Sequence, residues 1–131
     1  MAKRKSKKSL VFEFMQIAEL ERLSPAERVN KILKIVRDDK IILLEGRFKK
    51  QEEAHLIQKT MESIDNKFKG IEIAVINPSK ETSGFFEKLK TSLASMLFGE
   101  RDGFTLIGPA TIIREIKQNP RKLNQLAIDL S

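Results

Sequence analysis

Short apolar segments alternate with longer amphipathic ones along most of this chain. Each segment with the length and residue types of a β-strand is followed by one with apolar residues at helical spacing. Strands that alternate with helices need crossover connections, which place helices on both faces of a sheet. The sequence therefore predicts one α/β domain with about four strands in a mixed or mostly parallel sheet, in the order β-α-β-α-β-α-β-α. The predicted strands are residues 9–20, 40–46, 70–76 and 103–108, the predicted helices are 24–39, 49–64, 83–99 and 109–118, and 121–130 is predicted to be a short last helix or turn.

The helix over residues 24–39 has the clearest local signals. Ser24 is a good N-cap, Pro25 suits the first helical position, and Glu27 completes a capping box. The helix over 49–64 is less marked. Its apolar residues Ala54, Ile57, Met61 and Ile64 fall on one side.

Positive charge is concentrated at the N-terminus. The chain of 131 residues has 25 basic and 18 acidic side chains and a net charge of +7, and the first eight residues hold five of the basic ones and no acidic one. The remainder, with 20 basic against 18 acidic side chains, is nearly balanced. We therefore predict a disordered basic arm over residues 1–8 and a single domain over 9–131. The basic residues of the arm are Lys3, Arg4, Lys5, Lys7 and Lys8.

Several function classes lose support from the composition. The chain has no cysteine, which excludes disulfides, thiolate nucleophiles and cysteine-ligated metals. Its longest apolar runs have four residues, whereas a membrane span needs about 20. Since the basic N-terminus is not followed by a long uncharged apolar stretch, no signal peptide is predicted either. The expected location is the cytoplasm.

Catalytic motifs are also missing. His55 is the single histidine, so it has no second histidine with which to share a metal. No serine lies in a G-x-S-x-G turn, and no G-x-x-x-x-G-K-[ST] phosphate loop is present. The sequence predicts that the protein is not an enzyme and has no cofactor or metal.

Two groups of basic residues are candidates for binding nucleic acid: the arm, and a C-terminal basic patch. The predicted strands lack the exposed aromatic residues on which RNA bases stack in recognition sheets, so binding would depend on phosphate contacts and shape. A merely solubilising arm is the competing interpretation. The C-terminal basic patch consists of Arg114, Lys117, Arg121 and Lys122.

The segment over residues 84–98 allows two interpretations. At helical spacing its apolar residues form one broad face, which suits a crossover helix packed on the sheet. The same face suits a helix that docks in a groove of a partner protein. A membrane surface fits less well, because the polar face carries two lysines against one glutamate. The apolar face consists of Phe85, Phe86, Leu89, Leu93, Met96 and Leu97.

Three stretches carry a family likeness: "MQIAELERLSPAERVNKILKIVRDDKIILLEG", "EEAHLIQKTMESID" with "FKGIEI", and "LFGERDGFTLIGPATIIREIKQNP". Together they resemble the archaeal domain-of-unknown-function family 2073 over roughly residues 10–128. The resemblance implies a place beside an Era-like GTPase, or in RNA and ribosome metabolism. It implies no catalytic residues.

Two functions follow as expectations. The leading one is a non-enzymatic accessory protein that binds RNA or a ribonucleoprotein, with the ribosome preferred, through the arm and the C-terminal basic patch. The alternative is an adaptor that docks on an Era-like GTPase or another protein through the helix over residues 84–98. The sequence leaves the oligomeric state open.

Overall fold

The computed structural model of the chain describes residues 9–65, 68–77, 79–92, 104–125 and 127–130. They form a mixed five-stranded sheet in the order β3-β4-β2-β1-β5. β1 is parallel to β2 and to β5, whereas β4 is antiparallel to both β2 and β3. The strands are β1 (Ser9–Gln16), β2 (Lys40–Glu45), β3 (Ile71–Ile76), β4 (Phe104–Pro109) and β5 (Ala127–Leu130).

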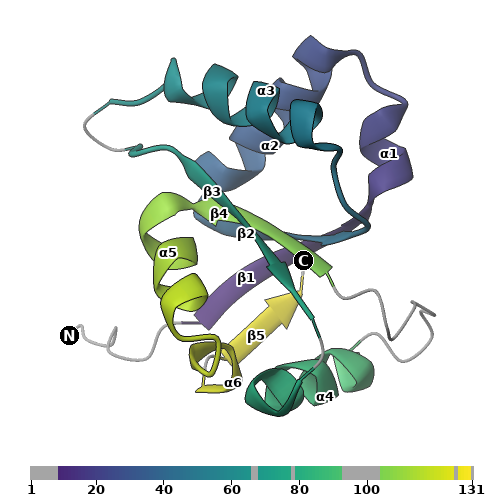
Figure 1. Cartoon of the computed structure of the whole chain (residues 1–131), viewed down its shortest axis with the longest axis vertical. Helices are drawn as coiled ribbons and strands as arrows, with labels where there is room; N and C mark the ends of the chain where they lie inside the picture. The colour runs from purple at the N-terminus through teal and green to yellow at the C-terminus, as the bar shows by residue number, and fades with distance from the viewer. Residues whose placement is uncertain (1–8, 66–67, 78, 93–103, 126, 131) are drawn as a thin grey trace.

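Helices cover both faces of the sheet, which confirms the predicted fold class. α1, α2 and α3 lie on one face, and α4, α5 and α6 lie on the other (Figure 1). A short 3-10 helix, η2 (Lys80–Thr82), leads into α4. The helices are α1 (Ile17–Glu21), α2 (Pro25–Arg37), α3 (Lys50–Met61), α4 (Ser83–Ser92), α5 (Ala110–Gln118) and α6 (Lys122–Gln125).

The pleat of the strands separates two hydrophobic cores. In β2, Ile41 and Leu43 point to the α4–α5 face, and Ile42 and Leu44 point to the α2–α3 face. All four side chains are fully buried. A strand that is buried on both faces has a continuous apolar sequence rather than an alternating one, as this strand does.

The predicted start of α2 is confirmed in detail. The Ser24 hydroxyl accepts a hydrogen bond from the Glu27 amide at 3.2 Å, and the Glu27 carboxylate accepts one from the Ser24 amide at 3.0 Å. Pro25 is the first helical residue. Two amide groups that the first helical turn would leave unpaired are thereby satisfied.

Two segments differ from the prediction. Residues 17–21 form α1 instead of continuing the first strand, which agrees with the helix-favouring Ala18, Glu19 and Leu20. Residues 127–130 form β5 instead of a last helix or turn. β5 exists because it pairs with β1, a partner more than 110 residues away that no local pattern indicates.

Gly46 allows the chain to leave β2 close to α1. Its φ of 120° lies in a region that side-chain-bearing residues rarely adopt. A Cβ atom there would also lie 2.7 Å from Cγ2 of Ile17. Glycine at this position therefore has both a conformational and a steric reason.

Candidate nucleic-acid interface

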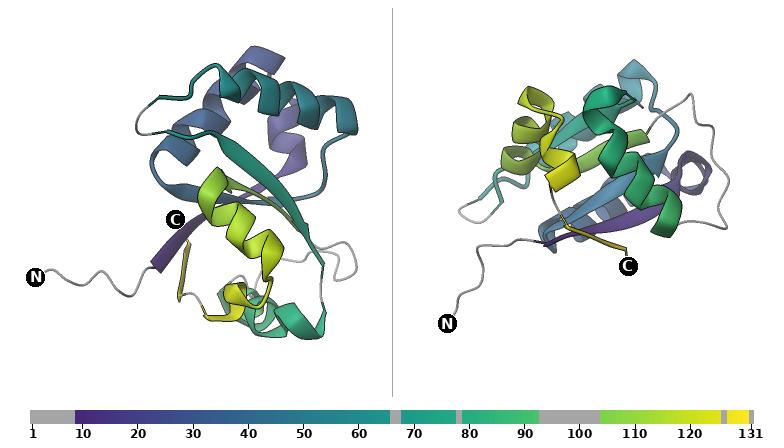
Figure 2. Two further views of the ribbon diagram at one scale, coloured as in Figure 1. Left: turned by 60° about the vertical axis from the view of Figure 1, so that its left-hand side comes forward. Right: turned by 90° about the horizontal axis from the view of Figure 1, so that it is seen from below.

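The arm is attached at the end of the sheet where its parallel strands begin. Residues 1–8 lie outside the described residues, but the chain enters the fold at Ser9, the first residue of β1. Ser9 pairs with Ala127, the first residue of β5. The starts of the two strands lie side by side (Figure 2). The arm therefore joins the fold next to the C-terminal segment.

Arg121 and Lys122 lie close to this point. Lys122 opens α6, five residues before Ala127, so even an extended chain would span about 18 Å or less between them. Both basic side chains are exposed. Pairing of β1 with β5 thus brings the attachment point of the arm near one half of the C-terminal basic patch.

Acidic side chains on neighbouring elements pair with three of the four residues of the patch. Lys117 Nζ donates a hydrogen bond to Glu72 Oε2 at 2.8 Å, and Arg114 Nε lies 3.5 Å from Glu72 Oε1. Lys122 Nζ lies 3.4 Å from Glu115 Oε1. No ion pair is recorded for Arg121 within the described part of the chain, so it is the patch residue best placed for an incoming phosphate.

The two cationic neighbours of Glu72 stabilise its ionised form. The hydrogen bond from Lys117 and the charges of Lys117 and Arg114 lower the pKa of Glu72 below its ordinary value of 4.5, although burial acts in the opposite direction. Because the pKa is lower in the folded state than in the unfolded state, ionised Glu72 stabilises the fold above pH 4.5. That contribution is lost as the pH falls through the folded-state pKa.

Replacing Glu72 by glutamine should lower the free energy of unfolding at pH 7 by about 1 kcal/mol or less, because the cationic partners are largely exposed. The difference from wild type should shrink below pH 4.5 and vanish once Glu72 is protonated. Urea unfolding of both proteins at several pH values measures it. Glu115→Gln is the matched control, because it also removes a carboxylate that pairs with a lysine, but one that is 63% exposed against 24% for Glu72. A Glu72→Gln effect that stays constant down to the lowest pH would contradict the ion-pair explanation.

Asn124 fixes α6 against α4. Its side-chain oxygen accepts a hydrogen bond from the Phe85 amide at 2.8 Å, and its side-chain nitrogen donates one to the Glu81 carbonyl at 2.6 Å. The Asn124 carbonyl accepts a third hydrogen bond, from Lys88 Nζ, at 2.8 Å. These contacts hold the basic start of α6 in a fixed position on the fold.

The described part of the 84–98 helix packs into the core. Phe85 and Leu89 are fully buried and Phe86 is nearly so. The Phe85 ring lies 5.8 Å from that of Phe12 and 5.6 Å from that of Phe86, between ring centres. The crossover-helix interpretation therefore holds for these three residues. Leu93, Met96 and Leu97 lie outside the described residues.

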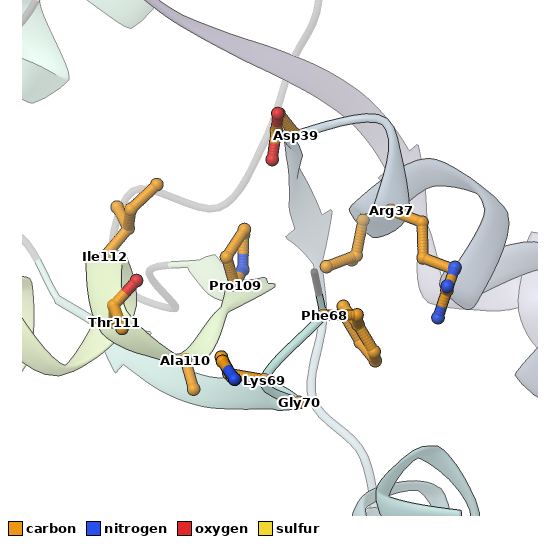
Figure 3. Close-up of a pocket in the computed structure, with 10 residues that line it drawn as sticks. Arg37, Asp39, Phe68, Lys69, Gly70, Pro109, Ala110, Thr111 and Ile112 are labelled. Atoms are coloured by element: carbon orange, nitrogen blue, oxygen red, sulfur yellow. The ribbon is translucent and has the colours of Figure 1, made fainter. Parts of the chain in front are cut away.

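A small cavity opens between the end of α2 and the start of α5. It has a volume of about 260 Å³, below the usual range for ligand pockets. Figure 3 shows Pro109 to Ile112 on one side and Phe68 on the other, with the Arg37 guanidinium directed away from the α5 wall. That group lies 5.0 Å over the Phe68 ring and donates a hydrogen bond to Asp65 at 2.9 Å. Arg37 lines the cavity, but its guanidinium is already engaged by Phe68 and Asp65.

A wider groove of about 530 Å³ lies between α2 and α3, and His55 is on its rim. His55 is exposed. Within the described ranges, no three histidine, aspartate or glutamate side chains are arranged to hold a metal ion. Nor is any helix in those ranges long and apolar enough to cross a membrane.

Sequence reasoning missed two parts of the candidate interface. It did not predict β5, which brings the arm and α6 together. It also did not identify Glu72 as the counter-charge of Arg114 and Lys117, because Glu72 lies more than 40 residues before them. Its place within the alternating strand 70–76 was a weak signal that it points to one face.

Comparison with protein families corrects the resemblance drawn from the sequence. Residues 20–127 match the family described as Origin-associated protein OapB, not the domain-of-unknown-function family 2073. The link to an Era-like GTPase came only from that resemblance and is set aside with it. Searches of curated proteins and of solved structures found no match. Because the match spans most of the 131 residues, this chain belongs to the OapB family of origin-associated proteins.

Proposed function

We propose that this protein is a non-enzymatic accessory protein that binds nucleic acid through its phosphate backbone. The arm and the C-terminal basic patch supply the contacts. The observation that supports this is the pairing of Ser9 with Ala127, because it brings the residue at which the arm joins the fold near the basic start of α6. Two basic segments from opposite ends of the chain then act on one region of the nucleic acid.

Phosphate contacts are a better basis for binding than base stacking. The described phenylalanines are buried or half-buried, including Phe12, Phe14 and Phe104 on the strands. Stacking platforms for single strands need exposed aromatic rings. Lysine and arginine contacts to phosphate do not depend on the base sequence.

The kind of nucleic acid has two candidates. The first is RNA or a ribonucleoprotein, with the ribosome as the preferred target; the resemblance that pointed to the ribosome is corrected above, and phosphate contacts alone do not favour RNA over DNA. The second is DNA: the family name, origin-associated protein, describes association with an origin, and we propose that nucleic acid mediates it. The family match begins at residue 20, so the arm lies outside the matched residues.

Fluorescence anisotropy with labelled RNA and DNA of equal length tests the proposal. We expect binding to both that weakens steeply with salt. On duplex DNA, the slope of log K against the logarithm of the salt concentration should be about −0.9 for each phosphate neutralised. Tighter binding to RNA at matched salt would identify RNA as the target; tighter binding to DNA would favour the origin. No binding to either at about 50 mM salt would contradict the proposal.

Arg121→Gln should weaken binding uniformly across sequences and reduce the salt slope by about 1, because one phosphate contact is lost. Arg47→Gln is the matched control. Arg47 is also exposed, but it follows β2 at the opposite end of the sheet from Ser9. Equal losses in the two variants would mean that binding depends on overall charge and not on the interface.

The adaptor function has no comparable support. Phe85, Phe86 and Leu89 would have to leave the core before they could dock on a partner. Docking through this face would therefore require the core packing of these three side chains to be lost.

A further inference from the structure

β3 forms one margin of the sheet, and no described strand pairs with its outer edge. Proteins commonly protect such edges with lysine, proline, a bulge or a very short strand. β5, at the other margin, has only four residues. β3 has six residues, no lysine or proline, and an unbroken register with β4. β3 is therefore an edge that can accept another strand.

The helix beside this edge exposes apolar side chains. In the described part of the chain, the large hydrophobic side chains that are exposed are Met61 (59%), Ile64 (44%) and Val75 (40%). Met61 ends α3, Ile64 follows it, and Val75 is on β3. Val75 points to the α2–α3 face, since it alternates in step with Ile71 and Ile73.

Met61 lies on the side of α3 that faces away from α2. Lys59 lines the groove between the two helices, and Met61 is about 200° further around α3. Because α3 packs on β3 whereas α2 packs on β2 and β4, the side away from α2 is the side of the free edge. Figure 1 shows β3 in front, with α3 above it and α5 below. Ala54, Met61 and Ile64, which the sequence placed on the apolar side of this helix, are thus exposed, whereas Leu56 and Thr60 are buried.

We propose that β3 pairs antiparallel with β3 of a second copy of this chain, across a two-fold axis perpendicular to the sheet. The sheet then continues through the join, and the Met61 sides of the two α3 helices pack together. With Ile73 or Ala74 on the axis, Val75 lies opposite Ile71 or Ile73 of the second copy, so that apolar residues meet in either register.

A second copy fits this surface better than a lone peptide strand does. An added strand alone would pair with the β3 backbone but leave Met61 in water. A two-fold axis perpendicular to the sheet keeps α3 on the same face in both copies. β3 of one copy then pairs with β3 of the other, and α3 of one copy packs against α3 of the other. The contact is about 20 Å long and 15–20 Å high, which is small beside the usual 800 Å² per partner. We therefore expect a dimer with a Kd in the micromolar range.

Charged side chains on the α4–α5 face of the sheet, near the dimer contact, determine how the dimer responds to salt. Each copy contributes Glu72 with Arg114 and Lys117, one negative charge against two positive ones. The two clusters repel each other weakly, and salt screens that repulsion. Added salt should therefore strengthen the dimer, whereas it weakens nucleic-acid binding, so the two associations can be separated.

Sedimentation velocity of the full chain at about 1–200 µM tests the proposal. We expect a monomer–dimer equilibrium whose Kd rises at least about 10-fold in Val75→Lys and in Met61→Lys, because each places a charge in the apolar contact. Gln58→Lys is the matched control; it adds the same charge to an exposed position of α3 that faces solvent, and should leave the Kd unchanged. Hydrogen exchange should show protection of the β3 amides that increases with protein concentration.

Circular dichroism establishes that each variant is folded. Should Val75→Lys fail to fold, Met61→Lys decides, since its side chain is mostly exposed. A wild-type protein that stays monomeric over the whole concentration range would overturn the proposal. So would a dimer that neither edge variant weakens, or one that Gln58→Lys weakens equally.

Discussion

Neutralising the arm should abolish most of the affinity of this protein for nucleic acid. If Lys3, Arg4, Lys5, Lys7 and Lys8 each neutralise a phosphate, replacing all five by glutamine makes the salt slope on duplex DNA less negative by about 4.5. Near 0.15 M salt this corresponds to a loss of affinity on the order of 1,000-fold. The effect is this large because release of condensed counterions from the phosphates drives the binding, and each basic side chain releases about one.

Charge and amino-acid identity can be separated within the arm. A variant in which the four lysines of the arm become arginines keeps every positive charge and should bind with nearly wild-type affinity and salt slope. The glutamine variant should unfold at the same urea concentration as wild type, because the arm precedes the first residue of β1. An unchanged salt slope in the glutamine variant would identify the arm as a solubilising terminus and refute its role in the interface.

Phe85→Ala should lower the free energy of unfolding by about 3–5 kcal/mol. The side chain is fully buried and its ring contacts those of Phe12 and Phe86, so its removal leaves a cavity among packed aromatic rings. Small domains are stable by only about 5–15 kcal/mol, so a large part of the total would be lost. Urea unfolding followed by circular dichroism measures the change.

Ser83→Ala is the control for Phe85→Ala, since Ser83 is an exposed residue of the same helix and its loss should change stability by about 0.5 kcal/mol or less. The experiment also separates the two interpretations of this helix. If the face of Phe85 served to dock on a partner, its truncation would leave the isolated protein as stable as wild type. A stability change below about 1 kcal/mol would therefore contradict the core placement.

Signals that act over a few residues predicted much of the fold. Ser24, Pro25 and Glu27 located the start of α2, because a capping box is closed within four residues. The apolar run of β2 predicted a strand buried on both faces. The first prediction succeeded because the hydrogen bonds of a capping box join residues that are near in sequence. The second succeeded because an apolar run shows that a strand is covered on both faces, whichever elements cover it.

The candidate site was predicted only as separate groups of charge. Its basic residues could be named, but not their arrangement. Arg114 and Lys117 are partly neutralised by Glu72, whereas no such partner is recorded among the described residues for Arg121. Pairing across the fold depends on where α5 crosses β3, which the spacing of residues within α5 does not reveal.

The sequence by itself determined that this chain forms an α/β domain with a basic N-terminal segment, because periodicity and charge are local properties. Only the tertiary structure decided the order and direction of the strands. A strand buried on both faces has the same apolar pattern whether its neighbours are parallel or antiparallel, so nothing in residues 104–109 indicates that β4 runs between β2 and β3 against both. The same long-range pairing made a strand of residues 127–130 and placed Ser9, where the arm joins the fold, near α6. It also left the outer edge of β3 without a partner among the described strands.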